Sequence, residues 1–187
     1  MLAVFGLGNP RQYGGTRHNI GSFTVGLLKG SAVLKKKGKY CDVFLVGRRA
    51  AFIRGKTYMN DSGLAFEEAR EMLEVSPVDI LVVCDDFNIP LGRVRYRISG
   101  SSGGHRGLQS VIDCAQTQDF PRLRIGIGFP RDENVAPKDW VLSEFTSSRG
   151  ELHAVKKVSR AAADYIADHI RAAGWPPENE SFCVQDI

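Results

Sequence analysis

Four short polar stretches carry the side chains of this chain that could do chemistry, and each follows an apolar stretch or precedes a helical one. They read GLGNPRQYGGTRHN (from Gly6), KTYMNDSG, VCDDFNIPLG and SGSSGGHRGLQS. A histidine that is held by a buried aspartate can act as a general base on water. Side-chain amides can polarise a carbonyl group and stabilise the oxyanion that forms. The stretches therefore predict direct hydrolysis of an ester or amide, with no metal and no covalent intermediate.

The same stretches also allow other interpretations. Gly6-x-Gly8 after an apolar run is typical of a dinucleotide-binding turn, but the third glycine and the acidic residue about 20 positions later are absent. Asparagines such as Asn9 and Asn60 are often only turn or capping residues. Asp85 and Asp86 could end a strand or bind magnesium. The glycine-rich loop at 100–104 could bind phosphate through its backbone N–H groups. No Gly-x-Ser-x-Gly motif is present, so a nucleophile elbow is not expected.

The elements that must position these residues alternate between strands and helices. Apolar or alternating runs predict strands, and apolar residues at helical spacing predict helices. The strands are expected at 2–5, 42–46, 50–54, 80–84, 94–98 and 123–127, and the helices at 19–28, 62–73, 108–115 and 151–173. This order predicts an α/β fold, a single domain over residues 1–187, with a mixed, mostly parallel, twisted sheet that has helices on both faces. The polar tail at 176–187 is expected to be irregular.

Composition limits the classes of protein that fit. The chain has 187 residues, of which 43% are hydrophobic and 25% charged, which is ordinary for a globular protein. No apolar run approaches the roughly 20 residues that span a bilayer. The apolar strand expected at the start leaves no room for a signal or transit peptide. The four cysteines form no Cys-x-x-Cys pair, so neither a zinc site nor a disulfide framework is expected. Such cysteine usage predicts a location in the reducing cytoplasm.

Positive charge gathers in three places, although the net charge is only +4. These are the lysines at 35–39, the arginines of Arg93-x-Arg95-x-Arg97, and Arg122-x-Arg124. Such a distribution favours a polyanionic ligand on one face. For the lysine run, a solvated surface is an equally good interpretation.

In order and spacing, GLGNP…Y…TRHNIG, KTYMNDSG, DDFNIPLG, GGHRGL and RLRIGIG resemble the bacterial peptidyl-tRNA hydrolase family, and the resemblance extends from Val4 to about Phe145. It implies a monomeric, cytoplasmic α/β enzyme without cofactor or metal. The substrate it implies is peptidyl-tRNA, with no membrane partner. The implied reaction is cleavage of the ester between the peptide and the 3′ ribose, which recycles tRNA from aborted translation.

The resemblance also implies roles for individual residues. His18 would activate water, and Asp85 would hold its imidazole. Substrate contacts would come from Asn9, Tyr13, Met59, Asn60, His105 and Arg106. The tRNA would be bound by Arg95, Arg97 and Arg124. The family usually has asparagine where this chain has Arg106, and a guanidinium prefers phosphate, so Arg106 is expected to contact a phosphate of the acceptor end of tRNA and to take no part in the chemistry.

Two further classes remain open at this level. A catalytically idle relative would serve as an RNA-binding module, against which the presence of both His18 and Asp85 argues. A nucleotide-binding oxidoreductase is the third class, and titration with cofactor would test it. A turnover assay separates the hydrolase from both.

Overall fold

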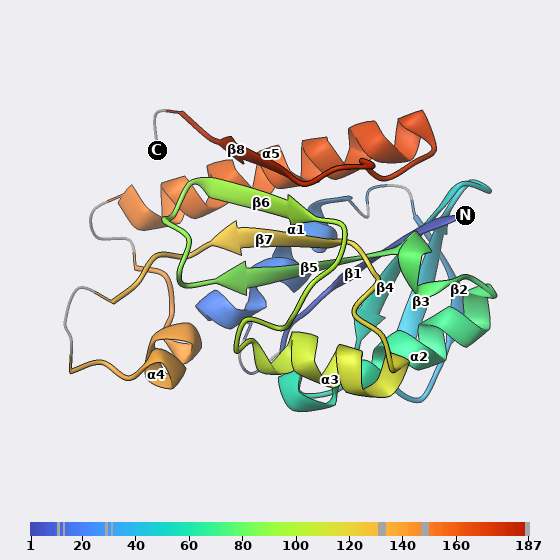
Figure 1. Ribbon diagram of the computed structural model, residues 1–187, viewed down its shortest axis with the longest axis horizontal. Coiled ribbons are helices and arrows are strands. Elements are labelled where there is room, and N and C mark those ends of the chain that lie inside the picture. The colour runs from blue at the N-terminus through green and yellow to red at the C-terminus, as the bar shows by residue number, and fades with distance from the viewer. Residues whose placement is uncertain are drawn as a thin grey trace.

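The computed structural model describes residues 1–10, 12, 14–28, 30, 32–130, 134–146 and 150–185 (Figure 1). Its strands are β1 (Leu2–Gly6), β2 (Val33–Lys37), β3 (Cys41–Val46), β4 (Ala50–Gly55), β5 (Ile80–Asp86), β6 (Arg93–Arg97), β7 (Arg122–Gly126) and β8 (Glu180–Cys183). The helices are α1 (Ile20–Leu28), α2 (Ser62–Leu73), α3 (Arg106–Ala115), α4 (Pro137–Leu142) and α5 (Glu151–Ala172). Short 3₁₀ turns are η2 (Arg17–Asn19), η3 (Met59–Asp61) and η4 (Pro77–Asp79).

The strands form one eight-stranded sheet in the order β2-β3-β4-β1-β5-β7-β6-β8. β1 pairs in parallel with β4 and β5, and β5 pairs in parallel with β7. The other four of the seven pairings between described strands are antiparallel. The expected mixed sheet is confirmed, but the expectation that it is mostly parallel is wrong, because parallel pairing is confined to its centre. β1, β4, β5 and β7 consequently end at one edge of the sheet, where an open α/β sheet places its site.

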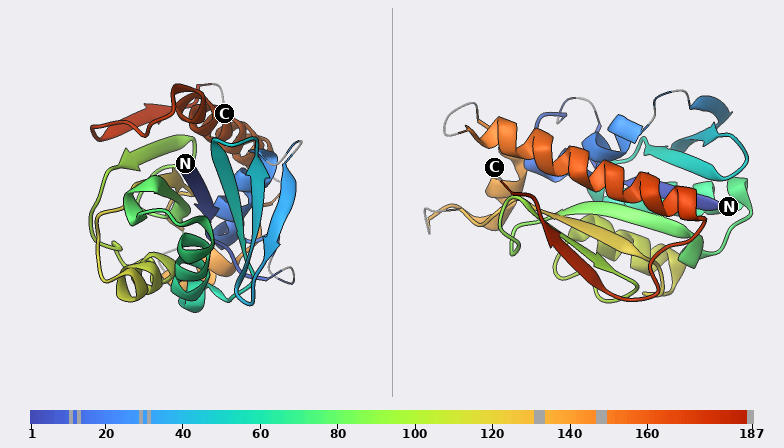
Figure 2. Two further views of the ribbon diagram at one scale, coloured as in Figure 1. Left: turned by 90° about the vertical axis from the view of Figure 1, so that its right-hand side faces the viewer. Right: turned by 90° about the horizontal axis from the view of Figure 1, so that it is seen from above.

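Helices cover both faces of the sheet, as expected (Figure 2). One face packs on α2 and α3, and its core includes Phe5, Phe66, Leu108 and Phe120. The other face packs on α1 and α5 around a second cluster that includes Val83, Leu123, Ile125 and Val158. β5 supplies fully buried side chains to both clusters, which explains its continuous apolar sequence.

Helix α1 approaches the central strands more closely than any side chain would permit. At Gly21, a Cβ atom would overlap the carbonyl oxygen of Val83 in β5 and would lie 2.9 Å from the carbonyl oxygen of Leu7. Only glycine therefore allows α1 to lie at this depth. Because η2 leads directly into α1, this approach also sets how close His18 comes to the end of β5.

Three elements differ from the sequence-based expectation. Residues 176–187 were expected to be irregular, but Glu180–Cys183 forms β8, which pairs with β6 and gives that strand a second neighbour. The lysine run lies in β2, an edge strand, and its side chains at 35–37 are exposed. Charged edge strands resist pairing with other chains, so the solvated interpretation of this run suffices. Helix α4 was not expected at all.

Candidate active site

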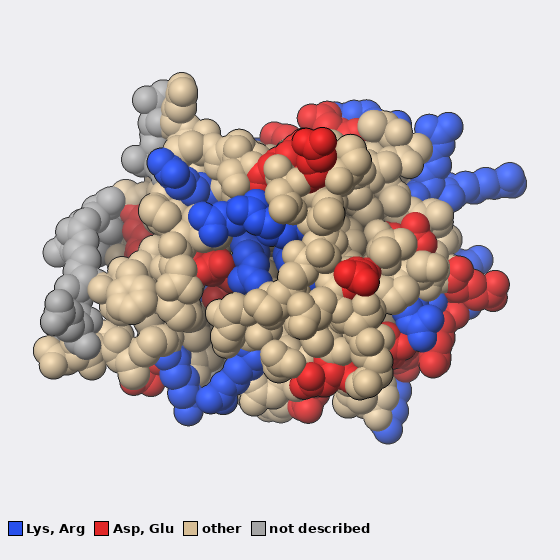
Figure 3. All heavy atoms as spheres, in the orientation of Figure 1, with Lys and Arg blue, Asp and Glu red and all other residues tan. Residues whose placement is uncertain are grey.

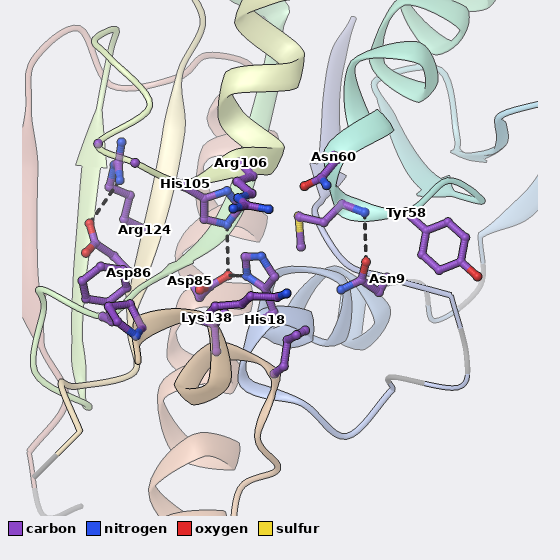
Figure 4. A pocket seen from close by; sticks show the side chains of 17 residues that line it. Asn9, His18, Tyr58, Asn60, Asp85, Asp86, His105, Arg106, Arg124 and Lys138 are labelled. Atoms are coloured by element: carbon purple, nitrogen blue, oxygen red, sulfur yellow. Dashed lines mark hydrogen bonds and ion pairs between the residues drawn. The ribbon is translucent and has the colours of Figure 1, made fainter. Parts of the chain in front are cut away.

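Loops from the ends of the parallel strands surround a cleft of about 550 Å³ (Figure 4). The residues after β1 bring Asn9 and His18, and those after β4 bring Met59 and Asn60. β5 itself ends with Asp85 and Asp86, which also line the cleft. His105 and Arg106 enter from the start of α3, and Arg124 from β7. Sequence reasoning thus named most of the polar residues that the fold brings together here. Tyr13 lies outside the described residues.

His18 and Asp85 are in direct contact at the centre of the cleft. The Nδ1 atom of His18 lies 2.8 Å from Oδ1 of Asp85, and the carboxylate is only 2% exposed. An ionised carboxylate is an acceptor only, so Nδ1 carries the proton and Nε2 is left with a lone pair. Among the described residues, none hydrogen-bonds to that Nε2 atom. The arrangement suits a general base that takes a proton from water in the cleft.

His105 contacts the same carboxylate oxygen from the other side. Its Nε2 atom lies 3.0 Å from Oδ1 of Asp85. Its Nδ1 atom accepts hydrogen bonds from the backbone N–H groups of Gly107 and Leu108, at 3.1 and 3.2 Å, and so caps α3. Because Nδ1 is an acceptor, the proton of the neutral ring is on Nε2, which donates to Asp85. His105 is buried, and all of its ring nitrogens are used in these contacts.

The two imidazoles determine the ionisation of Asp85. Burial by itself would raise the pKa of this carboxyl group, but the charge and hydrogen bonds of His105 and His18 hold the pKa well below its ordinary value. Asp85 is therefore a carboxylate throughout the neutral range. It can stabilise the positive charge that forms on His18 when the imidazole takes a proton.

Asn9 has a fixed amide orientation. Its Oδ1 atom accepts a hydrogen bond from the backbone N–H of Met59 at 2.9 Å, which ties the loop after β1 to η3. The side chain of Asn19 holds the backbone of Asn9 from the other side. Its Oδ1 accepts from the N–H of Asn9 at 2.9 Å, and its Nδ2 donates to the carbonyl of Asn9 at 3.0 Å. With Oδ1 engaged, the Nδ2 group of Asn9 is the donor that faces the cleft.

Asn60 is exposed at the same end of the cleft. The capping interpretation does not fit it, because the residue at the N-cap of α2 is Asp61. Within the described chain its side chain has no hydrogen-bond partner, so both its donor and acceptor are available to a ligand. Beside it, Met59 is 4% exposed and forms part of the apolar lining.

Two arginines of β7 hold the glycine-rich loop through its carbonyl groups. Arg122 donates to the carbonyls of Gly100 and Ser101, and Arg124 donates to those of Ser101 and Ser102 at 2.9 and 3.1 Å. The loop thereby follows β7 toward the carboxyl edge and delivers His105 there. Arg122 is 1% exposed, and burial lowers its pKa to about 10. These contacts engage the carbonyl groups of the loop, whereas phosphate binding through its backbone N–H groups, which was considered from the sequence, stays a prediction.

The predicted tRNA-binding arginines fall into two kinds. Arg124 is 9% exposed and also pairs with Asp86, at 3.1 Å between Nη1 and Oδ2. Arg95 is exposed on β6 directly opposite Arg124, and Arg97 lies opposite Arg122. Burial, followed by the charges of Arg95 and Arg124, lowers the pKa of Arg97, as expected where cations crowd together. Figure 3 shows basic side chains gathered over β6 and β7 beside a hollow with acidic groups.

Helix α4 forms a further wall of the cleft, to which it contributes Lys138, Val141 and Leu142. Arg17 fixes this wall to the turn that bears His18. Its guanidinium donates to Ser143 Oγ and Glu144 O, pairs with Glu151 at 2.5 Å, and stacks 3.8 Å from the centre of the Trp140 ring. The sequence analysis missed Arg17 and Lys138. The signal for Arg17 was its position beside His18, and for α4 it was a proline at the first helical position.

His18, Asp85 and His105 also offer ligand atoms within 4.8 Å of one another, a set that could hold a metal ion. In this structure the facing ring nitrogens of His18 and His105 are both hydrogen-bonded to Oδ1 of Asp85. The second nitrogen of His105 is occupied by two backbone N–H groups. A metal ion bound by Nδ1 of His18, Oδ1 of Asp85 and Nε2 of His105 would have to displace both hydrogen bonds to Asp85. Metal independence remains a prediction.

A mixed α/β sheet with a His–Asp pair and two amides at its carboxyl edge indicates a hydrolase. The model of the peptidyl-tRNA hydrolase family matches residues 3–180, and the chain belongs to this family of hydrolases, as the resemblance predicted. It is 43% identical to the peptidyl-tRNA hydrolase of Persephonella marina, covering 89% of this chain and 85% of that one. It is 39% identical to that of Fervidobacterium nodosum, with 90% of each chain covered. The crystal structure of peptidyl-tRNA hydrolase from Acinetobacter baumannii has a TM-score of 0.77 and 27% identity, with 92% of this chain and 88% of that one covered.

Within the described part of the chain, none of the helices has both the length and the apolar character needed to cross a membrane.

Proposed function

We propose that this chain hydrolyses the ester that joins a peptide, or an N-blocked aminoacyl group, to the 3′ ribose of tRNA, and so releases free tRNA. Membership of the family supports hydrolysis of peptidyl-tRNA. The observation that carries the mechanism is the 2.8 Å contact between His18 Nδ1 and Asp85 Oδ1. It leaves Nε2 of His18 as a base within the cleft.

In the proposed mechanism, Nε2 of His18 removes a proton from water as the water oxygen attacks the ester carbonyl carbon. Asp85 stabilises the resulting imidazolium. The Nδ2 group of Asn9 donates to the carbonyl oxygen as negative charge develops on it, and Asn60 binds the peptide main chain. When the tetrahedral intermediate collapses, the imidazolium returns the proton to the departing 3′ oxygen of the ribose.

In this proposal the arginines of β6 bind the negatively charged backbone of the tRNA. Neither Arg95 nor Arg97 forms an ion pair with a carboxylate of the described chain, and Arg95 lies opposite Arg124, which lines the cleft. Their role is to bind backbone phosphate, which fixes the position of the acceptor stem without reading its sequence. Cytoplasmic location and a monomeric state, which the resemblance implies, remain predictions.

The decisive experiment follows release of tRNA from N-acetyl-aminoacyl-tRNA by the wild-type protein and by the His18→Ala variant. Loss of a general base typically costs about 10²- to 10⁴-fold in rate, whereas tRNA affinity should stay within a few-fold. Binding without turnover in the wild type would leave an RNA-binding module instead. If the variant retained more than about a tenth of the wild-type rate, the assignment of His18 as the base would be wrong.

A further inference from the structure

Two cations in the cleft have no role in the mechanism above. Arg106 is the first residue of α3, and Lys138 is the second residue of α4. Both line the cleft and both are exposed. Figure 4 shows them on opposite walls, with His18 and Asp85 between them. Neither forms an ion pair or hydrogen bond with any residue that the structure describes.

The acidic groups of the cleft cannot neutralise these cations. Asp85 and Asp86 are the carboxylates among the described residues that line it. Asp85 accepts from His18 and His105 through Oδ1. Asp86 pairs with Arg124 through Oδ2 and accepts the backbone N–H of Asn88 through Oδ1. Arg106 and Lys138 therefore leave a local excess of positive charge beside the His–Asp pair, and the complement of such a site is an anion.

Both cations lie on helices whose positions are fixed by side-chain contacts. Arg106 follows His105, whose ring is fixed by Asp85 and by the first turn of α3. Lys138 is on α4, which Arg17 holds through Ser143, Glu144 and the ring of Trp140. The backbone positions of the two cations are thus set relative to His18. Only their side chains have to order around a ligand, which reduces the entropic cost of binding.

The direction of the cleft indicates which anion this is. Asp86 and Arg124 lie at one end, toward the arginines of β6, and Asn9, Tyr58 and Asn60 lie at the other (Figure 4). If the acceptor strand enters from the arginine end and the peptide occupies the amide end, the 3′-terminal ribose lies between them. The fixed negative charge closest to the scissile ester is then the phosphodiester on the 5′ carbon of that same ribose. A peptide carboxylate would be present in only some substrates.

We infer that Arg106 and Lys138 together bind the phosphodiester that precedes the 3′-terminal nucleoside of the substrate. This inference rests on the proposed function. It adds to that function the two residues that bind the last phosphodiester of the substrate. The two cations contact a non-bridging oxygen each and do not take part in proton transfer. They favour an ester on a polynucleotide over the same ester on a nucleoside.

The test compares two ligands that differ only in charge, the dinucleotide CpA and its neutral methylphosphonate analogue, by calorimetric titration at low salt. The wild type should bind CpA about fivefold more tightly. The expected ratio is small because contacts between charged groups at exposed sites contribute little free energy. Arg106→Ala and Lys138→Ala should each reduce this ratio toward one without weakening binding of the analogue. Arg160→Ala and Lys156→Ala remove the same charges from exposed positions of α5 and should leave the ratio unchanged.

Equal binding of both ligands by the wild type would overturn the inference, as would an equal loss for both ligands in the variants. A second arm compares hydrolysis of N-acetyl-Glu-tRNA with that of N-acetyl-Gln-tRNA. If the variants lose a preference for glutamate while CpA binding is unchanged, the cations recognise the peptide, and the inference is wrong. Titration needs no turnover, so CpA discrimination in a wild type that fails to hydrolyse peptidyl-tRNA would reject the proposed function and retain the anion site.

Discussion

The imidazole rings of His18 and His105 lie 4.8 Å apart, centre to centre, and both contact one oxygen of the same buried carboxylate. The two rings have opposite proton arrangements. His18 carries its proton on Nδ1, toward Asp85, and presents a bare Nε2 to the cleft. His105 carries its proton on Nε2, also toward Asp85, and uses Nδ1 as a helix cap. One ring is therefore free to exchange protons with water, while the other is confined to fixing the carboxylate.

Replacing His105 with asparagine should separate its two contacts. Asparagine is a good N-cap residue, so α3 should retain its cap, but the shorter side chain cannot reach Asp85. We expect the His105→Asn variant to keep its thermal stability within a few degrees. Its kcat should fall by about tenfold, with little change in KM, because one of the two donors that fix the carboxylate is lost. Steady-state kinetics beside a melting curve would check this.

His105→Ala is the matched control, because it removes the cap as well and should also lower stability. The resemblance assigns His105 to the peptide groove instead. A rise in KM for longer peptides with kcat unchanged would support that assignment and contradict a positioning role.

Asp85→Asn should change the dependence of stability on acid. The folded pKa of Asp85 is below its ordinary value of about 3.9, so the unfolded state binds a proton first as the pH falls. The ionised group therefore stabilises the fold fully above that pH, and its contribution is lost progressively below it. We expect the difference in unfolding free energy between the wild type and Asp85→Asn to shrink as the pH is lowered from about 6 to 3. Urea titrations at several pH values measure it.

The same variant should be slow at neutral pH, because an amide stabilises an imidazolium less well than a carboxylate does. A parallel pH–rate profile would show this. Superimposable profiles for the two proteins would mean that Asp85 does not assist His18.

Arg95 and Arg124 should respond differently to replacement by alanine, although both are predicted to bind tRNA. Arg95 is exposed, so its loss should reduce the slope of log affinity against log salt by about 0.9, the contribution of one duplex phosphate. Arg124 is buried against Asp86 and the carbonyls of Ser101 and Ser102, so its loss should lower stability. Filter-binding titrations from low to moderate salt, with melting curves for both variants, separate the two. An unchanged slope for Arg95→Ala would remove it from the tRNA site.

Chelation should leave activity intact. The described contacts use His18 Nδ1, Asp85 Oδ1 and both ring nitrogens of His105 for hydrogen bonds, and the proposed mechanism needs only proton transfer. We expect the rate of tRNA release to be the same after dialysis against EDTA as before it. Inactivation that zinc or magnesium reverses would show that the cluster is a metal site.

Much of the site could be predicted from the sequence because it depends on strand order. Apolar runs followed by polar loops place Asn9, Asn60 and Asp85 at one edge once the central strands are parallel. Contacts that depend on the path of a loop could not be predicted in this way. The route of residues 100–104 is set by Arg122 and Arg124, whose partners are backbone carbonyls without a sequence pattern. Helix α4 has only six residues, too few for a periodic apolar face, and its position is set by Arg17.

Gly21 lies outside the cleft, yet a methyl group there would collide with the backbone of β5. The strand could not yield without moving the carboxylate at its own end, and α1 could not yield without moving the turn that precedes it. A Gly21→Ala allele should therefore behave in a genetic screen like a lesion of the catalytic pair, with protein that accumulates less and works poorly. Sorting missense variants by their distance from the substrate would place this position among the harmless ones.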